Sequence, residues 1–264
     1  MTQQFLDQTA GDDRHVAIGL LGEFQVMKHG RSVMQRAEKT ERLLSMLAMQ
    51  PRQTASRGRL LETVWPKIEP ELAGQSLNSL VHSLRRLLSD ALGGEAPIVV
   101  DSGMYRLNLD AGIRVDALDF ETAILAGDAA YRDGQLEAAE SHYRAAVALY
   151  QGDLLLFSES DMVVDRQRLR ARFQSALSRL AVRRFAAADY DGCLHYAYRL
   201  LKSDPCCEDA HRWIMRCHAR RGERTQAMRQ YQLCVELLKT HFVTTPEAET
   251  VMLHESIVRN SRAV

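Results

Sequence analysis

The chain has 264 residues, of which 46% are hydrophobic and 26% charged, and its formal net charge is +0. This length suits one large or two ordinary domains, and the neutral balance excludes a uniformly basic nucleic-acid binder, so any such function must rest on local patches of charge. Residues 1–15 lack the apolar core of a signal peptide, and no run of about 18 apolar residues predicts a membrane span. We therefore expect a cytoplasmic protein without a membrane partner, in which residues 1–15 form a flexible tail.

Residues 16–109 carry most of the strand signals, beginning with VAIGLLGEFQVMKHGRSV, which has a strand-like apolar run and a turn signal at His29-Gly30. Three helical patterns follow. The second of them begins with Ser56 as its N-cap and ends before Pro66. The predicted helices cover residues 36–49, 56–65 and 76–90.

After these helices, PIVVDSGMYRLNLD predicts a hairpin with its turn at residues 101–103. The order of strands, three helices and hairpin is that of a winged helix-turn-helix. In that fold the third helix enters the major groove of DNA, and the hairpin touches the flanking backbone.

The third predicted helix, SLNSLVHSLRRLLSD, has an apolar and a polar face. At about 100° per residue its large apolar residues share one arc, and polar residues gather on the opposite side. That side has no acidic residue between Gln75 and Ser89, whereas an ordinary solvated face mixes Glu and Lys. Its groups can bond to base edges and phosphates, although a plain surface helix is the competing interpretation. The base-reading candidates are Gln75, Asn78, Ser79, His82 and Arg86.

Cationic side chains surround this helix in the sequence. Residues 16–109 hold 12 Lys and Arg against 9 Asp and Glu, a balance of +3. Three arginines cluster at the entry to the second helix, where backbone N–H groups also favour phosphate. The phosphate-binding candidates are Arg52, Arg57, Arg59, Arg85 and Arg106.

Residues 111–264 read as helix apart from turns, and they contain an internal repeat. Two segments share a glycine, a small residue five positions later, a tyrosine after nine and a small residue after twelve. This is tetratricopeptide spacing, in which small residues let paired helices approach closely, and it predicts a short solenoid with a concave face. The copies are Gly134, Ala139, Tyr143 and Ala146, then Gly222, Ala227, Tyr231 and Cys234, with a weaker middle copy around Tyr190, Cys193 and Asp204-Pro205.

Arginines form two stripes at helical spacing in this part of the chain. Such stripes can hold a small anionic effector, such as a nucleotide or a cyclic dinucleotide. The interpretation that we favour is a solvated face paired with nearby acids such as Asp165, Glu208 and Asp209. The stripes are Arg168, Arg172, Arg179 and Arg183, and Arg212, Arg216 and Arg220.

Enzyme signatures are missing from the sequence. It contains no GxxxxGK[ST], GxSxG, HExxH or GxGxxG motif, so we expect neither catalysis nor a cofactor. The five cysteines form no CxxC pair and are expected to be small buried residues. A zinc site built from Cys206, Cys207, His211 and Cys217 would match no standard spacing.

Several of these stretches together resemble the OmpR-type winged helix and, more narrowly, the SARP group of bacterial transcriptional activators. The resemblance lies in LLSMLAMQPRQTASRGRLLETVWP, SLNSLVHSLRRLL and SGMYRL. Ser83 and Gly58 depart from it, since the family commonly has Arg and an acidic residue there. The segment IRVDALDFETAILAG is similar to the start of the bacterial transcriptional activator domain. The matching positions are Pro51, Ser56-Arg57, Leu84-Arg85-Arg86, residues 103–107, Val115, Asp116 and Phe120.

The resemblance implies a mainly α protein with an N-terminal winged helix-turn-helix and small β-sheets at residues 16–110. A C-terminal all-α tetratricopeptide-like solenoid follows at residues 111–264. It implies a sequence-specific, nucleoid-associated regulator that binds double-stranded promoter DNA as a homodimer and activates transcription. The helical repeats would then mediate dimerisation, contact RNA polymerase or sense an effector. The alternative is a protein-interaction scaffold or ligand sensor that has lost DNA binding, and the acid-free face of the third helix argues against it.

Overall fold

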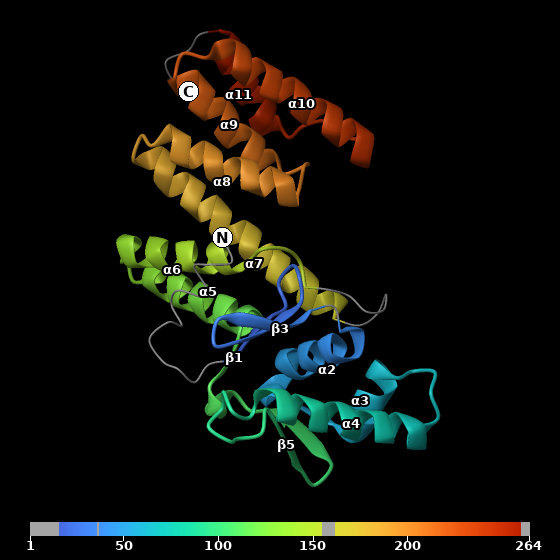
Figure 1. The fold of residues 1–264 in the computed structure, drawn as a ribbon. Coiled ribbons are helices and arrows are strands. Elements are labelled where there is room, and N and C mark those ends of the chain that lie inside the picture. Colours follow the sequence, from blue (N-terminus) through green and yellow to red (C-terminus); the bar gives the residue numbers. More distant parts are fainter. Residues whose placement is uncertain (1–15, 36, 155–161, 260–264) are drawn as a thin grey trace. The chain divides into compact units, whose positions relative to one another are not determined.

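The structure is a computed structural model that describes residues 16–35, 37–154 and 162–259, so the predicted tail at residues 1–15 lies outside the described residues (Figure 1). The chain divides into two compact units. One comprises Met1–Ala126 with Ala145–Arg170, and the other comprises Gly127–Arg144 with Ala171–Val264. Among the described residues, no helix has the length and apolar character needed to cross a membrane.

Four strands form the N-terminal sheet of the first unit, in the order β3-β2-β1-β7. The first three make an antiparallel meander, and β7 pairs parallel with β1 although it follows the hairpin in sequence. His29 and Gly30 have φ of 47° and 70° between β2 and β3, the type I′ geometry of a tight hairpin, so the predicted turn is confirmed. The strands are β1 (Val16–Gly19), β2 (Gln25–Lys28), β3 (Arg31–Gln35) and β7 (Ile113–Val115).

The predicted series of three helices and a hairpin is confirmed in the same unit. A second sheet has the antiparallel order β4-β6-β5, in which β5 and β6 are the predicted hairpin. The third helix starts at Pro70, earlier than the predicted residue 76, because proline suits the first turn of a helix. The elements are α2 (Glu38–Met49), the 3-10 turn η1 (Pro51–Gln53), β4 (Thr54–Ser56), α3 (Arg57–Val64), α4 (Pro70–Leu88), β5 (Ile98–Asp101) and β6 (Met104–Leu107).

Aliphatic side chains hold these helices together. Fully buried leucines project from each of them, namely Leu43 and Leu47 from α2, Leu60 from α3, and Leu77 and Leu84 from α4. Each such side chain contributes about 1.5–3 kcal/mol relative to an exposed one. The apolar arc of α4 is therefore the face that fixes this helix to the unit.

Helices make up nearly all of the described chain after β7, and a further 3-10 turn, η2 (Leu109–Ala111), precedes that strand. The fold is thus mainly α, with an N-terminal winged helix and C-terminal helical repeats, as predicted. The helices are α5 (Asp116–Arg132), α6 (Leu136–Leu149), α7 (Val163–Ala186), α8 (Tyr190–Ser203), α9 (Glu208–Arg220), α10 (Arg224–Phe242) and α11 (Ala248–Val258).

The glycine position of each repeat lies in the turn between two helices. Gly134 and Gly222 have φ of 73° and 77°, a left-handed conformation that glycine adopts without steric cost. In the middle copy Ala188 takes that position, with φ of 56°. A left-handed alanine costs roughly 1–2 kcal/mol, which is why the middle copy is weak in sequence yet present in the fold.

Candidate nucleic-acid interface

The α4 helix is anchored at its C-terminal end by Lys28 of β2. The Lys28 ammonium donates to the Leu87 carbonyl at 3.1 Å and lies 2.6 Å from the Asp90 carboxylate. A cation is favourable there because the last carbonyls of a helix carry partial negative charge. The hydrogen bond that Lys28 donates to the Asp90 carboxylate lowers the pKa of Asp90. Sequence reasoning missed this contact because the residues lie far apart in the chain.

The polar face of α4 points to solvent, as its periodicity predicts. Leu77, Leu84 and Leu88 are buried on one side. No acidic residue lies on the other side between Gln75 and Arg86, although Glu71 is exposed in the first turn of the helix. Among the described residues Arg85 and Arg86 have no ion-pair partner. Ser83 and Arg85 are exposed on this side. All the base-reading candidates are exposed as well, namely Gln75, Asn78, Ser79, His82 and Arg86.

Two of the arginines near the entry to α3 are exposed and form no ion pair with any residue that the structure describes. Arg59 is exposed, and its backbone N–H donates to Ser56 Oγ at 3.3 Å, which confirms the predicted N-cap. Arg52 is exposed in η1, with φ of 55° and ψ of 22°. The Arg52 carbonyl accepts a hydrogen bond from Thr54 Oγ1 at 2.9 Å, which holds this turn in place.

The other two phosphate candidates are engaged within the protein. Arg57 is half-buried, and its guanidinium lies against Gly74 of α4. Arg106, on β6, forms an ion pair with Asp110 at 3.2 Å. The Arg106 side chain is 40% exposed, so this ion pair contributes little to stability. The pair nevertheless engages the positive charge of Arg106 within the protein.

The tip of the hairpin is built as a tight turn without a cation. Ser102 and Gly103 have φ of 49° and 78°, again type I′, and Ser102 Oγ donates to Asp101 Oδ1 at 3.0 Å. In Figure 1 this hairpin carries the label β5. The tip itself therefore offers a hydroxyl, backbone amides and the exposed Asp101 carboxylate rather than positive charge.

The α7 arginines are largely bound to acids of the same compact unit. Arg168 pairs with Glu121 and, at 3.0 Å, with Asp165. Arg179 pairs with Asp128 at 2.7 Å and lies over the ring of Tyr131, with 4.9 Å from its Cζ to the ring centroid. Arg183 pairs with Glu137 at 3.0 Å, and Arg172 is half-buried on the same helix.

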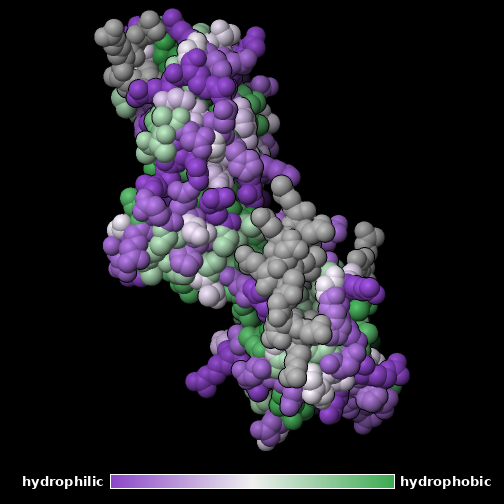
Figure 2. All heavy atoms as spheres, turned by 60° about the vertical axis from the view of Figure 1, so that its left-hand side comes forward, coloured by the Kyte–Doolittle hydropathy of each residue, from purple (hydrophilic) through white to green (hydrophobic). Residues whose placement is uncertain are grey.

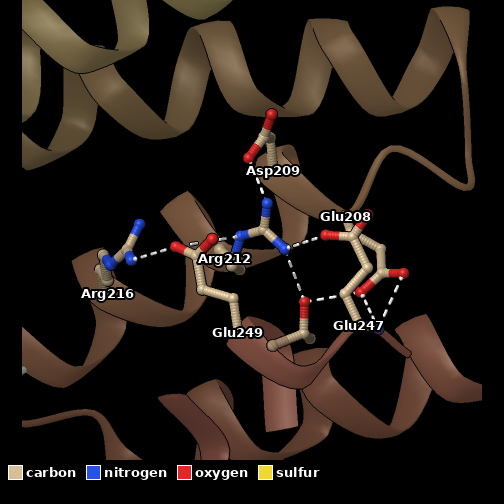
Figure 3. A network of polar contacts seen from close by, with 7 residues as sticks. Glu208, Asp209, Arg212, Arg216, Glu247 and Glu249 are labelled. Atoms are coloured by element: carbon tan, nitrogen blue, oxygen red, sulfur yellow. Dashed lines mark hydrogen bonds and ion pairs between the residues drawn. The ribbon is translucent and has the colours of Figure 1, made fainter. Parts of the chain in front are cut away.

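Arg212 and Arg216 of α9 lie beside acids at the start of α11, as Figure 3 shows. The Arg212 side chain is 7% exposed, donates to Glu247 at 2.9 Å and pairs with Asp209. Arg216 pairs with Glu249 at 3.2 Å, whereas Arg220 is exposed. The network thus fastens α11 to α9. The visible face of α8 to α11 in Figure 2 is mostly hydrophilic, as such charged pairs require.

Cys193, Cys217 and Cys234 are buried, as predicted, whereas Cys206 and Cys207 are only half-buried. His211 Nε2 donates to the Pro205 carbonyl at 2.9 Å, and its Nδ1 accepts from Gln230 at 2.7 Å. Burial lowers the pKa of His211. Both ring nitrogens are therefore occupied, and the described residues contain no group of three His, Cys, Asp or Glu side chains placed to hold a metal.

Asp116, at the start of α5, joins the first helix of the repeats to the N-terminal sheet. Its carboxyl oxygens accept hydrogen bonds from the backbone N–H groups of Leu20 at 2.8 Å and Leu21 at 3.0 Å. Burial raises the pKa of Asp116 to about 7 despite these bonds. Only the resemblance of IRVDALDF to a family segment pointed to this residue.

Two family models match the chain. Residues 115–258, more than half of its length, match the bacterial transcriptional activator domain. Residues 31–104 match the model described as transcriptional regulatory protein, C terminal.

Two regulators are similar in sequence. Regulatory protein DnrI of Streptomyces peucetius is 26% identical over 251 residues, which cover 92% of each chain. Transcriptional regulatory protein EmbR of Mycobacterium tuberculosis is 30% identical over 146 residues, which are 54% of this chain and 37% of EmbR.

A solved structure, Mycobacterium tuberculosis EmbR in complex with a low affinity phosphopeptide, matches with a TM-score of 0.71 and 22% identity. The match covers 94% of this chain but 66% of the EmbR chain. It shows that the two chains share their fold over nearly the whole length described above.

Proposed function

Because the chain belongs to the SARP-type family of bacterial transcriptional regulators, in which a winged helix precedes a bacterial transcriptional activator domain, we propose that it binds promoter DNA and activates transcription. The observation that carries this proposal is the exposed face of α4 from Gln75 to Arg86, which has no acidic residue and, among the described residues, no ion pair. A groove-reading helix must present donors and acceptors without repelling phosphates.

The exposed groups of α4 suit two kinds of contact. Asn78 and His82 occupy the centre of the face, where an amide and an imidazole can bond to base edges, and Gln75, Ser79 and Arg86 extend the same stripe. Arg85 lies at its rim, and Arg52 and Arg59 lie at the entry to α3, so these three contact phosphates. The base contacts set the sequence, and the phosphate contacts set register and affinity.

The test is binding of the full chain to a duplex selected from a random library and to random DNA, over a series of salt concentrations. Asn78→Ala is expected to cost about 1–3 kcal/mol at the selected site and to relax sequence choice at one position. Arg85→Ala and Arg59→Ala are expected to weaken both complexes and to lower the salt slope by about one.

Arg31→Ala is the matched control, because it removes one exposed positive charge from β3 without touching α4. Arg31→Ala is expected to leave the sequence preference of the protein unchanged. Should Asn78→Ala and His82→Ala leave the ratio of specific to random binding unchanged, α4 is not the reading helix. In that case the scaffold or sensor alternative takes its place.

The helical repeats, in this proposal, support self-association on DNA or contact with RNA polymerase. The pairing of Arg168, Arg179, Arg183 and Arg212 with carboxylates favours this over an anionic effector, because a nucleotide would have to displace those acids. Sedimentation of the full chain with and without promoter DNA, and with polymerase added, tests the assignment. A monomer that never retains polymerase would contradict it, as would a shift in melting temperature with a nucleotide or cyclic dinucleotide.

A further inference from the structure

Arg57, the first residue of α3, is unusual among the cationic residues of the winged helix because its guanidinium packs on a glycine. A Cβ added to Gly74 of α4 would overlap Arg57 Nη2 and would lie 3.0 Å from its Cζ and 3.3 Å from Nη1. The Arg57 side chain therefore fills the volume that any other residue at position 74 would use. Gly74 is buried inside a helix, where glycine is normally unfavourable relative to alanine. The contact with Arg57 accounts for its presence.

The backbone of Arg57 makes a second link. Its N–H donates to the Gly103 carbonyl in the turn of the hairpin at 2.9 Å, and the preceding residue, Ser56, pairs with Met104 of β6. One residue thus contacts α4 through its side chain and the hairpin through its backbone. These are the two elements of a winged helix that meet DNA.

On the proposed function, which this inference deepens, we propose that Arg57 is a positioning residue that sets α4 against α3 and the hairpin, rather than a phosphate ligand. The contact of the Arg57 guanidinium with Gly74 fixes the start of the exposed face of α4, since Gln75 and Asn78 follow Gly74 within about one turn. Displacing the guanidinium shifts this face, and the loss is one of sequence discrimination rather than of phosphate contacts. A phosphate ligand would behave in the opposite way.

The two roles give different results when the full chain binds selected and random duplexes. A positioning role predicts that Arg57→Ala lowers the ratio of specific to random binding about tenfold and leaves the salt slope unchanged. Gly74→Ala should do the same although it leaves every charge in place, because the new methyl group displaces Arg57. The double variant should lose less than the product of the two single losses, since the methyl group then enters space that the guanidinium has left.

The opposite pattern would overturn the inference. A phosphate ligand predicts that Arg57→Ala weakens both duplexes equally, lowers the salt slope by about one, and is independent of Gly74→Ala. Arg59→Ala serves as the reference for that behaviour, because Arg59 is exposed one position beyond Gly58.

A second measurement needs no DNA and separates this inference from the proposed function. In thermal unfolding, Gly74→Ala should raise the midpoint more in the Arg57→Ala background than in the wild-type background. Gly58→Ala is the control, because a Cβ there meets nothing within 4 Å, and its effect should be alike in both backgrounds. Equal shifts for Gly74→Ala in the two backgrounds would overturn the packing role. If the shifts differ but the full chain does not bind DNA, only the proposed function is overturned.

Discussion

Replacing Arg212 with alanine is expected to loosen α11 from α9. Arg212 donates to Glu247 and Thr250, both at 2.9 Å. Arg212 also pairs with Asp209. The side chains of Glu247 and Asp209 are 66% and 63% exposed, so each of these ion pairs contributes about 0.2–1 kcal/mol. The bond to buried Thr250 has a charged donor and is worth about 1.5–3 kcal/mol. Together with lost packing of the side-chain stem, the expected loss is about 3 kcal/mol.

Hydrogen exchange of the α11 amides in the full chain measures this loss locally. A change of that size corresponds to roughly a hundredfold faster opening of the helix. Arg212→Met, which keeps much of the apolar stem, should recover part of the protection and so separate packing from charge.

Arg216→Ala is the matched control, because Arg216 pairs with Glu249 alone among the acids of this network, at 3.2 Å, and that acid is 58% exposed. Its effect should stay below about 1 kcal/mol. If Arg212→Ala accelerates exchange in α11 no more than Arg216→Ala does, the buried bond to Thr250 carries no special energy and the reasoning fails.

Three further predictions concern stability. Burial raises the pKa of Asp116 to about 7 from an ordinary 3.8, so between these pH values its carboxyl is protonated in the folded chain and ionised in the unfolded chain. The free energy of unfolding should therefore fall by up to about 4 kcal/mol as the pH rises from 3.8 to about 7. The denaturant midpoint of Asp116→Asn should lack this fall. Ala188→Gly should raise the unfolding midpoint by relieving about 1 kcal/mol of left-handed strain, and a lower midpoint would contradict the assigned φ. Gly127→Ala should destabilise by about 1–3 kcal/mol because its Cβ would lie 2.7 Å from the Tyr143 ring, whereas Gly58→Ala, with open space around it, should stabilise slightly; equal denaturation curves for the two would refute the packing argument.

Sequence periodicity predicted the elements whose pattern is local. The two hairpin turns follow from residues that accept positive φ, such as Gly30 and Gly103, and the N-cap follows from Ser56. The exposed and buried faces of α4 follow from the same helical spacing, because an α-helix places the two sets of residues on opposite sides whatever surrounds it.

What the sequence did not reveal depends on partners distant in the chain. The strands β4 and β7 have three residues each, too few for an alternating pattern, and they exist because β6 and β1 offer hydrogen-bonding edges. The seat of Arg57 on Gly74 and the pairing of Arg168 with Glu121 are likewise set by tertiary packing. Without that packing, an arginine that fixes a neighbouring helix cannot be told from one that awaits a phosphate.

The parallel pairing of β7 with β1 also limits how this gene can be recombined. Ile113, Arg114 and Val115 complete the N-terminal sheet beside Val16, Ala17 and Ile18, although they follow the hairpin and match at Val115 the model of the other domain. A crossover that exchanged the helical repeats at the end of the hairpin would strip a strand from the winged helix and expose the edge of β1. Hybrid regulators that keep this winged helix should therefore retain the chain through β7 or import a strand in its place.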